Sequence, residues 1–376
     1  MQNKSIHYNI ILEAIGPVHI GSGTDINKKD CLYMENEKRV YIMDSLKVFE
    51  GMKKKSLLKD YDKFLMDPSQ KNFAVFVRTY NISPAEYKSW TAYILPLNDI
   101  TAVVNNSRSK GGGVDTIAAF VKDAYGCPYI PGSSLKGALR TAFENSLCVK
   151  NRDNYAVEAK KIEEEIFSGV NTDLSKKIFR TLKRNEEKSS AADDVFSFFR
   201  VSDSKPLNVS DLILCQKVDI TTDGTANLLP IKRECLKPGT KISFDIEVDK
   251  SYMDMQGRHI EINDESIYKA VDISYKIYYQ TFLSAYNKIT SVNSAAGHLM
   301  YIGGGSGFGT KTSVYSLYDN RNRSISAAQR ILVNTTPYIH KHRFDVRDYN
   351  VSPHMRKCTK YNGQLYDMGI CRIEVN

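Results

Sequence analysis

The 376-residue sequence has no long run of apolar residues and no closely paired cysteines. No apolar stretch reaches the ~20 residues that a bilayer-spanning helix needs, so we expect no transmembrane segment. The N-terminus leads into a strand-like segment and not into an apolar signal region. The seven cysteines are scattered, odd in number and never spaced C-x-x-C, which argues against a disulfide framework and a structural zinc site. These absences predict a cytoplasmic chain with no membrane, metal or other cofactor.

Acidic residues are outnumbered, and tryptophan occurs once. The 52 lysines and arginines exceed the 43 aspartates and glutamates by nine. That moderate excess suits a polyanionic partner such as nucleic acid. The 23 tyrosines and 15 phenylalanines include many rings able to stack on unpaired bases, although most should lie in the core. The 42% hydrophobic and 25% charged content is typical of a folded chain large enough for two cores.

The most informative segment is the signature stretch, Tyr129-Ile-Pro-Gly-Ser-Ser-Leu-Lys-Gly-Ala-Leu-Arg140. It predicts a short strand, a tight turn at its Pro-Gly pair and a helix running to about Leu147. Ser133 or Ser134 would cap that helix, because a hydroxyl can accept from the unpaired amides of the first turn.

Two cations of this stretch, Lys136 and Arg140, lie four residues apart and so share a face other than the apolar one. A helix N-terminus with free amides, hydroxyls and nearby cations predicts an anion site, most naturally for phosphate. An ordinary strand-turn-helix with solvated basic side chains explains the same spacing.

The glycine loop, Gly303-Gly-Gly-Ser-Gly-Phe-Gly309, is the second strong feature. Its glycines permit close backbone approach and present amides to an anion. It is not a Walker A motif, because Thr310 separates the last glycine from Lys311. It is not a dinucleotide fingerprint either, because Phe308 takes the final glycine position and we expect a helix before the loop. The loop and Lys311 therefore predict contact with an anion, with a mobile turn as the alternative.

The signature stretch resembles that of the RAMP proteins of type III CRISPR effector complexes. The first motif, Gly16-Pro-Val-His-Ile-Gly-Ser-Gly23, and the glycine loop resemble two further RAMP segments in the same order. Their order and the chain length are similar to those of the RAMP subunit of type III-A complexes that sits at the 3′ end of the guide RNA. The resemblance implies a non-catalytic subunit that binds the 3′ part of the guide RNA (crRNA) and is needed for its maturation and for complex assembly in antiviral defence.

The resemblance also implies an α+β fold with two ferredoxin-like (RRM-like) RAMP domains carrying helical and loop insertions. We place an N-terminal domain with the signature helix at 1–150, a charged helical insertion or linker at 151–194, and a C-terminal domain with the glycine loop at 195–376. Hydrophobic periodicity gives the main elements. These are strands at 6–14, 207–218 and 370–375, hairpins at 31–43 and 226–248, and helices at 114–121 and 264–289.

The expected partners are the guide RNA, the other subunits of the effector complex, especially the backbone RAMP subunit, and a recruited cellular nuclease that would trim the guide. We also note a basic tract, residues 321–360, with nine basic and two acidic residues. Its individual residues are weak candidates. The residues that we expect to bind RNA are His19, Ser22, Arg108, Lys110, Ser133, Ser134, Lys136, Arg140, Gly304, Gly305, Gly307, Gly309 and Lys311.

His19 leaves one alternative open. Related RAMP-type guide-processing nucleases use a histidine as general acid or base, so the chain could be a metal-independent endoribonuclease. A single histidine beside a Gly-Ser-Gly loop is more often structural or a hydrogen-bond donor to RNA. The other notable histidines, His340 and His342, are two residues apart and lack a clear second pair of metal ligands. We therefore expect no catalytic residue and no metal site.

Overall fold

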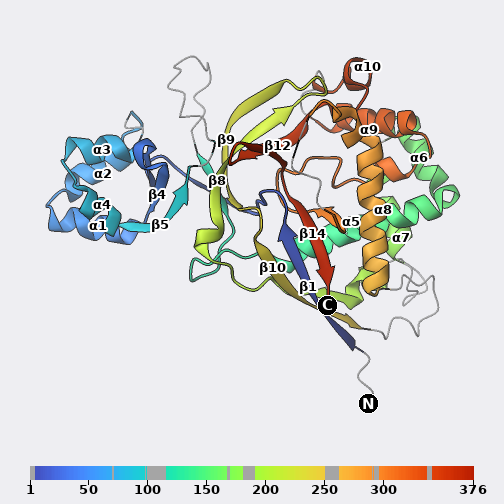
Figure 1. Cartoon of the computed structure of the whole chain (residues 1–376), viewed down its shortest axis with the longest axis horizontal. Coiled ribbons are helices and arrows are strands. Elements are labelled where there is room, and N and C mark those ends of the chain that lie inside the picture. The colour runs from blue at the N-terminus through green and yellow to red at the C-terminus, as the bar shows by residue number, and fades with distance from the viewer. Residues whose placement is uncertain are drawn as a thin grey trace.

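The computed structural model describes residues 5–69, 72–97, 99, 116–166, 170–180, 191–249, 262–289, 291, 296–336 and 341–376. In this part of the chain three β-sheets combine with ten α-helices, so the mixed α and β character is confirmed. Figure 1 shows a small lobe beside a larger body.

The first sheet of the larger body, sheet A, has the strand order β11-β14-β1-β10-β7, and every neighbouring pair is antiparallel. Its strands are β1 (Ser5–Ala14), β7 (Phe199–Val201), β10 (Lys241–Asp249), β11 (Leu299–Tyr301) and β14 (Ile370–Val375). Strands β1 and β7 are parallel, because both are antiparallel to β10, and α5 (Gly132–Lys150) lies between them in the sequence. Strands β10 and β14 are parallel for the same reason, with α8 (Asp264–Thr281) between them. Two interleaved βαβ units of this kind form one ferredoxin-like unit.

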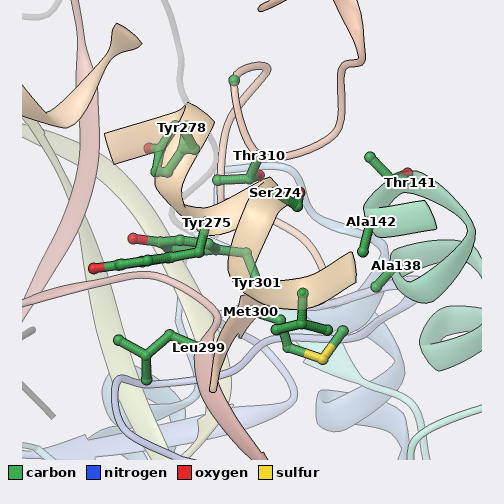
Figure 2. A pocket seen from close by; sticks show the side chains of 12 residues that line it. Ala138, Thr141, Ala142, Ser274, Tyr275, Tyr278, Leu299, Met300, Tyr301 and Thr310 are labelled. Atoms are coloured by element: carbon green, nitrogen blue, oxygen red, sulfur yellow. The ribbon is translucent and has the colours of Figure 1, made fainter. Parts of the chain in front are cut away.

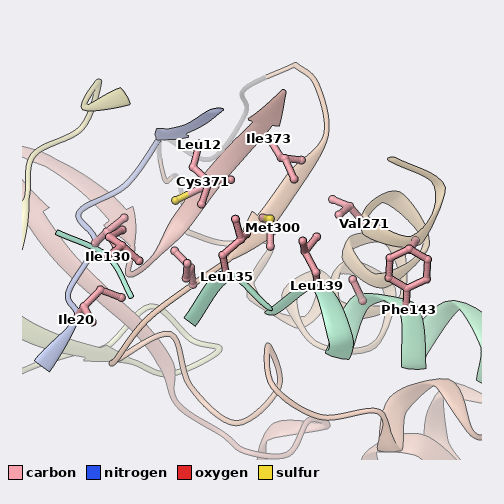
Figure 3. Packing of buried hydrophobic residues seen from close by; sticks show 14 of the residues in the cluster. Leu12, Ile20, Ile130, Leu135, Leu139, Phe143, Val271, Met300, Cys371 and Ile373 are labelled. Carbon is pink, nitrogen blue, oxygen red and sulfur yellow. The ribbon is translucent and has the colours of Figure 1, made fainter. Parts of the chain in front are cut away.

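The core of this unit lies between sheet A and its two helices. Alternate residues of β1, such as Leu12, point inward, whereas α5 contributes Leu135, Leu139 and Phe143 at helical spacing. Figure 3 shows these side chains packed against Val271 of α8 and against the strands. The predicted strand at 6–14, the helix after the Pro-Gly pair and the final strand at 370–375 are thereby confirmed.

Sheet B has the order β13-β12-β8-β9-β6-β2 and is antiparallel except between β6 and β9. Two predictions fail here. Residues 117–120, expected to be helical, form a strand whose Ile117 and Phe120 are buried. The segments at 226–236 and 241–249 do not form a hairpin, because they enter different sheets across the turn at Gly239. The strands are β2 (Gly21–Ile26), β6 (Ile117–Phe120), β8 (Leu212–Ile220), β9 (Ala226–Leu236), β12 (Arg356–Tyr361) and β13 (Gln364–Asp367).

The small lobe is an insertion between β2 and β6 with a hydrophobic cluster of its own, which includes Tyr41, Phe73 and Trp90. Its sheet has the order β3-β4-β5, so the predicted hairpin at 31–43 is confirmed. Asp44 caps the first helix by accepting from the amides of Leu46 and Lys47. The elements are β3 (Cys31–Met34), β4 (Arg39–Met43), α1 (Ser45–Lys54), α2 (Leu58–Met66), α3 (Phe73–Thr79), α4 (Pro84–Ser89) and β5 (Thr91–Pro96).

The remaining helices are α6 (Ala156–Glu163), α7 (Val170–Phe179), α9 (Arg321–Thr335) and α10 (Asp345–Tyr349). Helices α6 and α7 lie within the segment 151–194 that the sequence predicts to be helical. That segment does not separate the sheets, because β1 pairs with β10 and β14. The division into 1–150, 151–194 and 195–376 and a second ferredoxin-like domain stay predictions. Among the described residues no helix is both long and apolar enough to span a membrane, and all seven cysteines are free thiols.

Candidate nucleic-acid interface

The first motif and the glycine loop, almost 300 residues apart in the chain, are in direct contact. The amide of Gly304 donates to the carbonyl oxygen of His19 over 2.7 Å. Gly303 has a φ of +80°, and a Cβ atom at this position would lie 2.3 Å from the same carbonyl oxygen. Only glycine tolerates both the conformation and the close approach. The loop follows strand β11 and not a helix, which corrects the sequence-based expectation.

The side chain of His19 is buried beneath the loop, with 5% of its surface exposed. Its Nδ1 lies 2.7 Å from the carbonyl oxygen of Glu234, so that nitrogen carries the proton. Burial lowers the pKa of His19 below its ordinary value, and the hydrogen bond to Glu234 opposes this shift only in part. The imidazole is therefore neutral at pH 7, and a backbone carbonyl orients it.

The carboxylate of Glu234 fixes the strand beneath His19. It is fully buried and accepts from Lys122 Nζ at 2.5 Å, the Tyr93 hydroxyl at 2.7 Å and the Phe120 amide at 2.8 Å. These partners come from the small lobe and from the β6 region, so the network ties both to β9. A buried carboxylate with three donors is well satisfied, so its role here is to hold these elements together.

Two cations of sheet B, Arg233 and Lys357, lie beside the glycine loop, and Lys217 lies near them; none of the three belongs to a sequence motif. The Nη1 atom of Arg233 lies 2.6 Å from the position that a Cβ atom of Gly305 would occupy. The Cγ atom of Lys357 lies 3.2 Å from the corresponding position at Gly307. Lys217 is close enough to Arg233 and Lys357 to feel both charges. The signal in the sequence is a lysine and an aspartate placed two residues apart in a strand, residues 212–220, that is otherwise apolar except for Gln216.

The N-terminus of α5 differs from the predicted anion site. Neither Ser133 nor Ser134 caps the helix, because the residue at the cap position is Pro131 and it makes no side-chain hydrogen bond. The amide of Gly132 instead donates to the carboxylate of Asp203 over 2.8 Å. An intramolecular anion thus already occupies part of this helix terminus. A Cβ atom on Gly132 would lie 2.3 Å from the Val201 carbonyl oxygen, so this glycine serves the packing of α5 against β7.

Lys136 and Arg140 share one face of α5, as predicted, but this face points toward Asp194. Arg140 forms a bidentate ion pair with the Asp194 carboxylate, at 3.0 and 2.7 Å, and its guanidinium lies 4.0 Å from the centre of the Phe179 ring. Lys136 is partly buried near the same aspartate, and burial lowers its pKa. An RNA-binding role for the two residues stays a prediction.

The opposite face of α5 meets the end of the glycine loop. Ala138 and Thr141 of the helix line a small cavity together with Thr310 and with Tyr275 of α8 (Figure 2). Its volume of about 30 Å³ is close to that of one water molecule, so it is too small for a nucleotide. The three sequence motifs therefore converge through packing, and the cations of the signature stretch lie outside this contact.

The other predicted residues are spread around the loop. Ser22 is exposed on the edge strand β2, where its hydroxyl contacts Thr24. Lys311 is exposed immediately after the loop, whereas Gly309 is buried against Tyr278. Arg108 and Lys110 lie outside the described residues.

The basic tract at 321–360 is largely paired within the protein. Arg323 bonds to Glu163 and Arg356 to Asp367, both in ion pairs, and Arg347 pairs with the adjacent Asp348. His340 lies outside the described residues. The tract as a whole therefore resembles an internally compensated surface more than a continuous RNA-binding patch.

His342 and His354 flank the buried Asp345, and together the three could offer ligand atoms to a metal ion. Their Nδ1 atoms lie 2.8 and 2.6 Å from the two oxygens of Asp345. Neighbouring ligands of a tetrahedral zinc ion would be about 3.3 Å apart, given zinc–ligand bonds of about 2.0 Å. The observed distances are those of hydrogen bonds, which join the three side chains in one cluster.

Comparison with known proteins agrees with these features. The profile of the RAMP superfamily matches residues 11–310. A protein of Mycobacterium tuberculosis named CRISPR system protein Csm5 is 29% identical over 98% of this chain and 97% of its own length. Its namesake from Streptococcus thermophilus is 31% identical, covering 83% of this chain and 81% of that protein.

Solved structures show the same fold. One chain in a cryo-EM structure of a Csm–crRNA–target RNA ternary complex of a type III-A CRISPR–Cas system superposes with a TM-score of 0.64 at 19% identity, covering 98% of this chain and all 100% of that one. The crystal structure of T. onnurineus Csm5 gives a TM-score of 0.62 at 18% identity, over 96% of this chain and 99% of that one. The chain therefore belongs to the RAMP superfamily and, within it, to the Csm5 family of type III-A CRISPR effector subunits.

Proposed function

We propose that this chain is a non-catalytic RNA-binding subunit of a type III-A CRISPR ribonucleoprotein in the cytoplasm. It binds the 3′ part of the guide RNA, and it is needed for guide maturation and for assembly of the complex. The guide RNA and the backbone RAMP subunit are its main partners, and a recruited cellular nuclease trims the guide.

The contact between the first motif and the glycine loop carries this proposal. The backbone of His19 holds Gly304, so the loop is kept in one place against sheet B. Cations of sheet B then line the loop, with Arg233 beside Gly305 and Lys357 beside Gly307. A half-buried glycine loop with cations alongside suits a phosphate backbone of any sequence.

The open face of sheet A is less suited to RNA binding than the glycine loop is. RRM domains bind RNA on such a face through aromatic side chains. Here the outward residues of four of its five strands, β1, β7, β10 and β14, include no phenylalanine, tyrosine or tryptophan, and acidic residues outnumber basic ones. The acidic residues are Glu13, Asp245, Glu247, Asp249 and Glu374, and the basic ones are Arg200, Lys241 and Arg372. We therefore place the RNA along the glycine loop and sheet B.

The environment of His19 favours binding over catalysis. A general acid or base is most effective with a pKa near the working pH and a partner that stabilises its charged form. Burial instead lowers the pKa of His19, and its Nδ1 faces a carbonyl oxygen and not a carboxylate. The endoribonuclease alternative has only the identity of the residue in its favour.

One assay separates the two functions. Purified protein is incubated with fluorescently labelled guide precursor in EDTA, and both binding and new fragments are measured. We expect binding without cleavage. Lys311→Gln should weaken binding for every sequence and flatten the salt dependence by about one unit or less. Lys160→Gln removes the same charge from an exposed site on α6 and serves as the control. New fragments that disappear in His19→Asn would overturn the non-catalytic assignment.

The position at the guide 3′ end requires a test in cells. If this subunit covers that part of the guide, a nuclease that trims the RNA stops at its edge. Strains lacking the subunit should accumulate guides of intermediate, untrimmed length. Sequencing of guide 3′ ends from deletion and complemented strains measures this, and normal mature ends in the deletion strain would refute the proposed role in maturation.

A further inference from the structure

The face of sheet B beneath the glycine loop carries three cations around one acid. Lys357 of β12 pairs directly across the sheet with Asp219 of β8. Lys217 belongs to the same strand as Asp219, two residues earlier, and Arg233 comes from the neighbouring strand β9. The group has three positive charges and one negative charge, so it carries an excess of positive charge.

Asp219 holds two of these cations at once. Its Oδ2 atom lies 2.8 Å from Lys357 Nζ and 3.5 Å from Lys217 Nζ. The exposed fractions of the side chains are 10% for Asp219, 17% for Lys217 and 22% for Lys357. Water therefore screens the charges of the group only weakly. Burial, followed by repulsion from the charge of Lys357, lowers the pKa of Lys217.

Two polar atoms of the group lack hydrogen bonds within the described structure. These are Asp219 Oδ1 and Arg233 Nη1, and both are buried. An unpaired buried donor is costly, and it is stabilised when an acceptor arrives. The Arg233 donor sits next to Gly305, on the side of the group that faces the loop.

The local backbone supports this arrangement. Between Gln216 and Val218 of β8 the paired residues of β9 run from Lys232 to Leu228, so β9 carries a bulge opposite Lys217. A bulge interrupts the ladder and bends the bulged strand. Without it, strict alternation would leave the pairing of β8 unbroken at this point. Regular pairing between β8 and β9 is thus interrupted at the point where the like charges lie close together.

We propose that Lys217, Arg233 and Lys357 form a binding site for a phosphodiester group of RNA, and that Asp219 is a built-in counter-ion which this phosphate displaces. The inference rests on the proposed RNA-binding function and adds the residues and the internal competitor. In the free protein the carboxylate balances the lysines. When RNA binds, the non-bridging oxygens of a phosphate accept from Arg233 and Lys357, and Lys357 exchanges one anion for another.

Asp219 consequently weakens RNA binding while it stabilises the fold. Its removal leaves three cations unbalanced, so the fold loses stability and the phosphate meets a larger positive charge. Few substitutions are expected to lower stability and tighten binding together. A variant that merely unfolds cannot imitate this result, because unfolding weakens binding.

The experiment compares Asp219→Asn with Glu164→Gln by fluorescence anisotropy with labelled single-stranded guide RNA, and by thermal unfolding. Glu164→Gln changes the net charge by the same amount at an exposed i,i+4 ion pair of the α6 region. We expect Asp219→Asn to bind RNA roughly five- to tenfold more tightly, with a salt slope steeper by at most about 0.7 and a lower Tm. Glu164→Gln should change affinity less than about twofold, because exposed pairs are weak and screened.

A double mutant shows whether Lys357 carries the effect. In a Lys357→Gln background, Asp219→Asn should gain much less affinity, because the two groups are coupled. Equal gains in both backgrounds, or no gain in Asp219→Asn while the wild type binds RNA, would overturn the counter-ion proposal and leave the proposed function intact. Failure of the wild type to bind RNA would overturn both. A poly-glutamate chain that competes as well as unlabelled RNA would show a general anion site and refute the RNA assignment.

Discussion

Replacement of Arg140 by alanine separates two roles for the signature arginine. The sequence predicts an RNA contact, whereas the structure gives the guanidinium a carboxylate partner and an aromatic platform. Its two hydrogen bonds to Asp194 measure 3.0 and 2.7 Å, and the Phe179 ring centre is 4.0 Å away. The side chains of Arg140 and Asp194 are 28% and 18% exposed. We therefore expect Arg140→Ala to act mainly on stability.

The size of the loss follows from these contacts. An exposed ion pair contributes less than about 1 kcal/mol to stability, whereas disruption of a buried pair costs about 3–5 kcal/mol. We expect the contribution of this half-buried bidentate pair to be intermediate. We take about 2 kcal/mol for the pair and add about 0.5–1 kcal/mol for the guanidinium over Phe179. A total of roughly 2.5–3 kcal/mol corresponds to a fall in Tm of roughly 3–4 °C for a chain of this length.

Thermal unfolding and RNA titrations at several salt concentrations test the assignment. Arg140→Ala should lose stability as estimated, while its RNA affinity well below the Tm and its salt slope stay unchanged. Arg140→Lys should recover little, because an ammonium cannot make the planar two-point contact. A double-mutant cycle with Asp194→Asn should show strong coupling. An unchanged Tm together with a salt slope reduced by about 0.7 would refute the structural role and establish a phosphate contact.

Two further predictions follow from the glycine loop and from His19. Gly309→Ala should lower the free energy of unfolding by about 1–2 kcal/mol, because its new methyl group would lie 2.8 Å from Tyr278 Cε2. Gly307 has a φ of +97° and lies next to Lys357. RNA titrations of both variants should show that Gly307→Ala weakens binding more than Gly309→Ala does. The unfolded chain binds a proton at His19 below pH 6.5, whereas burial lowers the folded pKa, so stability from this group is complete above that pH and is lost as pH falls toward the folded pKa. The Tm advantage of wild type over His19→Asn should therefore shrink between pH 7.5 and 5.5, and a constant difference would contradict a buried neutral imidazole.

Local patterns in the sequence predict local structure well. The alternation at residues 6–14 is strand β1, and the apolar face of the signature stretch is the buried face of α5. The tertiary partners of individual side chains are not predicted by such local patterns. The acid that pairs with Arg140 is 54 residues away, and the carboxylate that takes the Gly132 amide is 71 residues away. No local pattern identifies either aspartate, since each lies in a segment without strong periodicity.

The failed hairpin at 226–248 has a similar cause. A turn at Pro238-Gly239 between two strand-like segments favours a hairpin locally. Strand partners from elsewhere in the chain prevent this hairpin. Strand β9 pairs with β8 over most of its length, and β10 pairs with β1 from Lys241 to Asp249. The same long-range pairing hides the cations of sheet B, because Lys217 and Lys357 meet only when β8 and β12 lie side by side.

The interleaved ferredoxin-like unit explains why motifs so far apart in the sequence meet at one place. Strands β1 and β11 are both antiparallel to β14 and so run parallel to each other. Their ends therefore lie at the same edge of sheet A. The first motif follows β1 and the glycine loop follows β11, so both begin at this edge. Helix α5 packs against the end of the loop at Thr141 and Thr310. The small lobe is inserted after β2 and is tied through Tyr93 to Glu234 of β9, so it supports the strand beneath His19. The sheet edge, rather than any one stretch of sequence, is therefore the unit on which the proposed RNA binding depends.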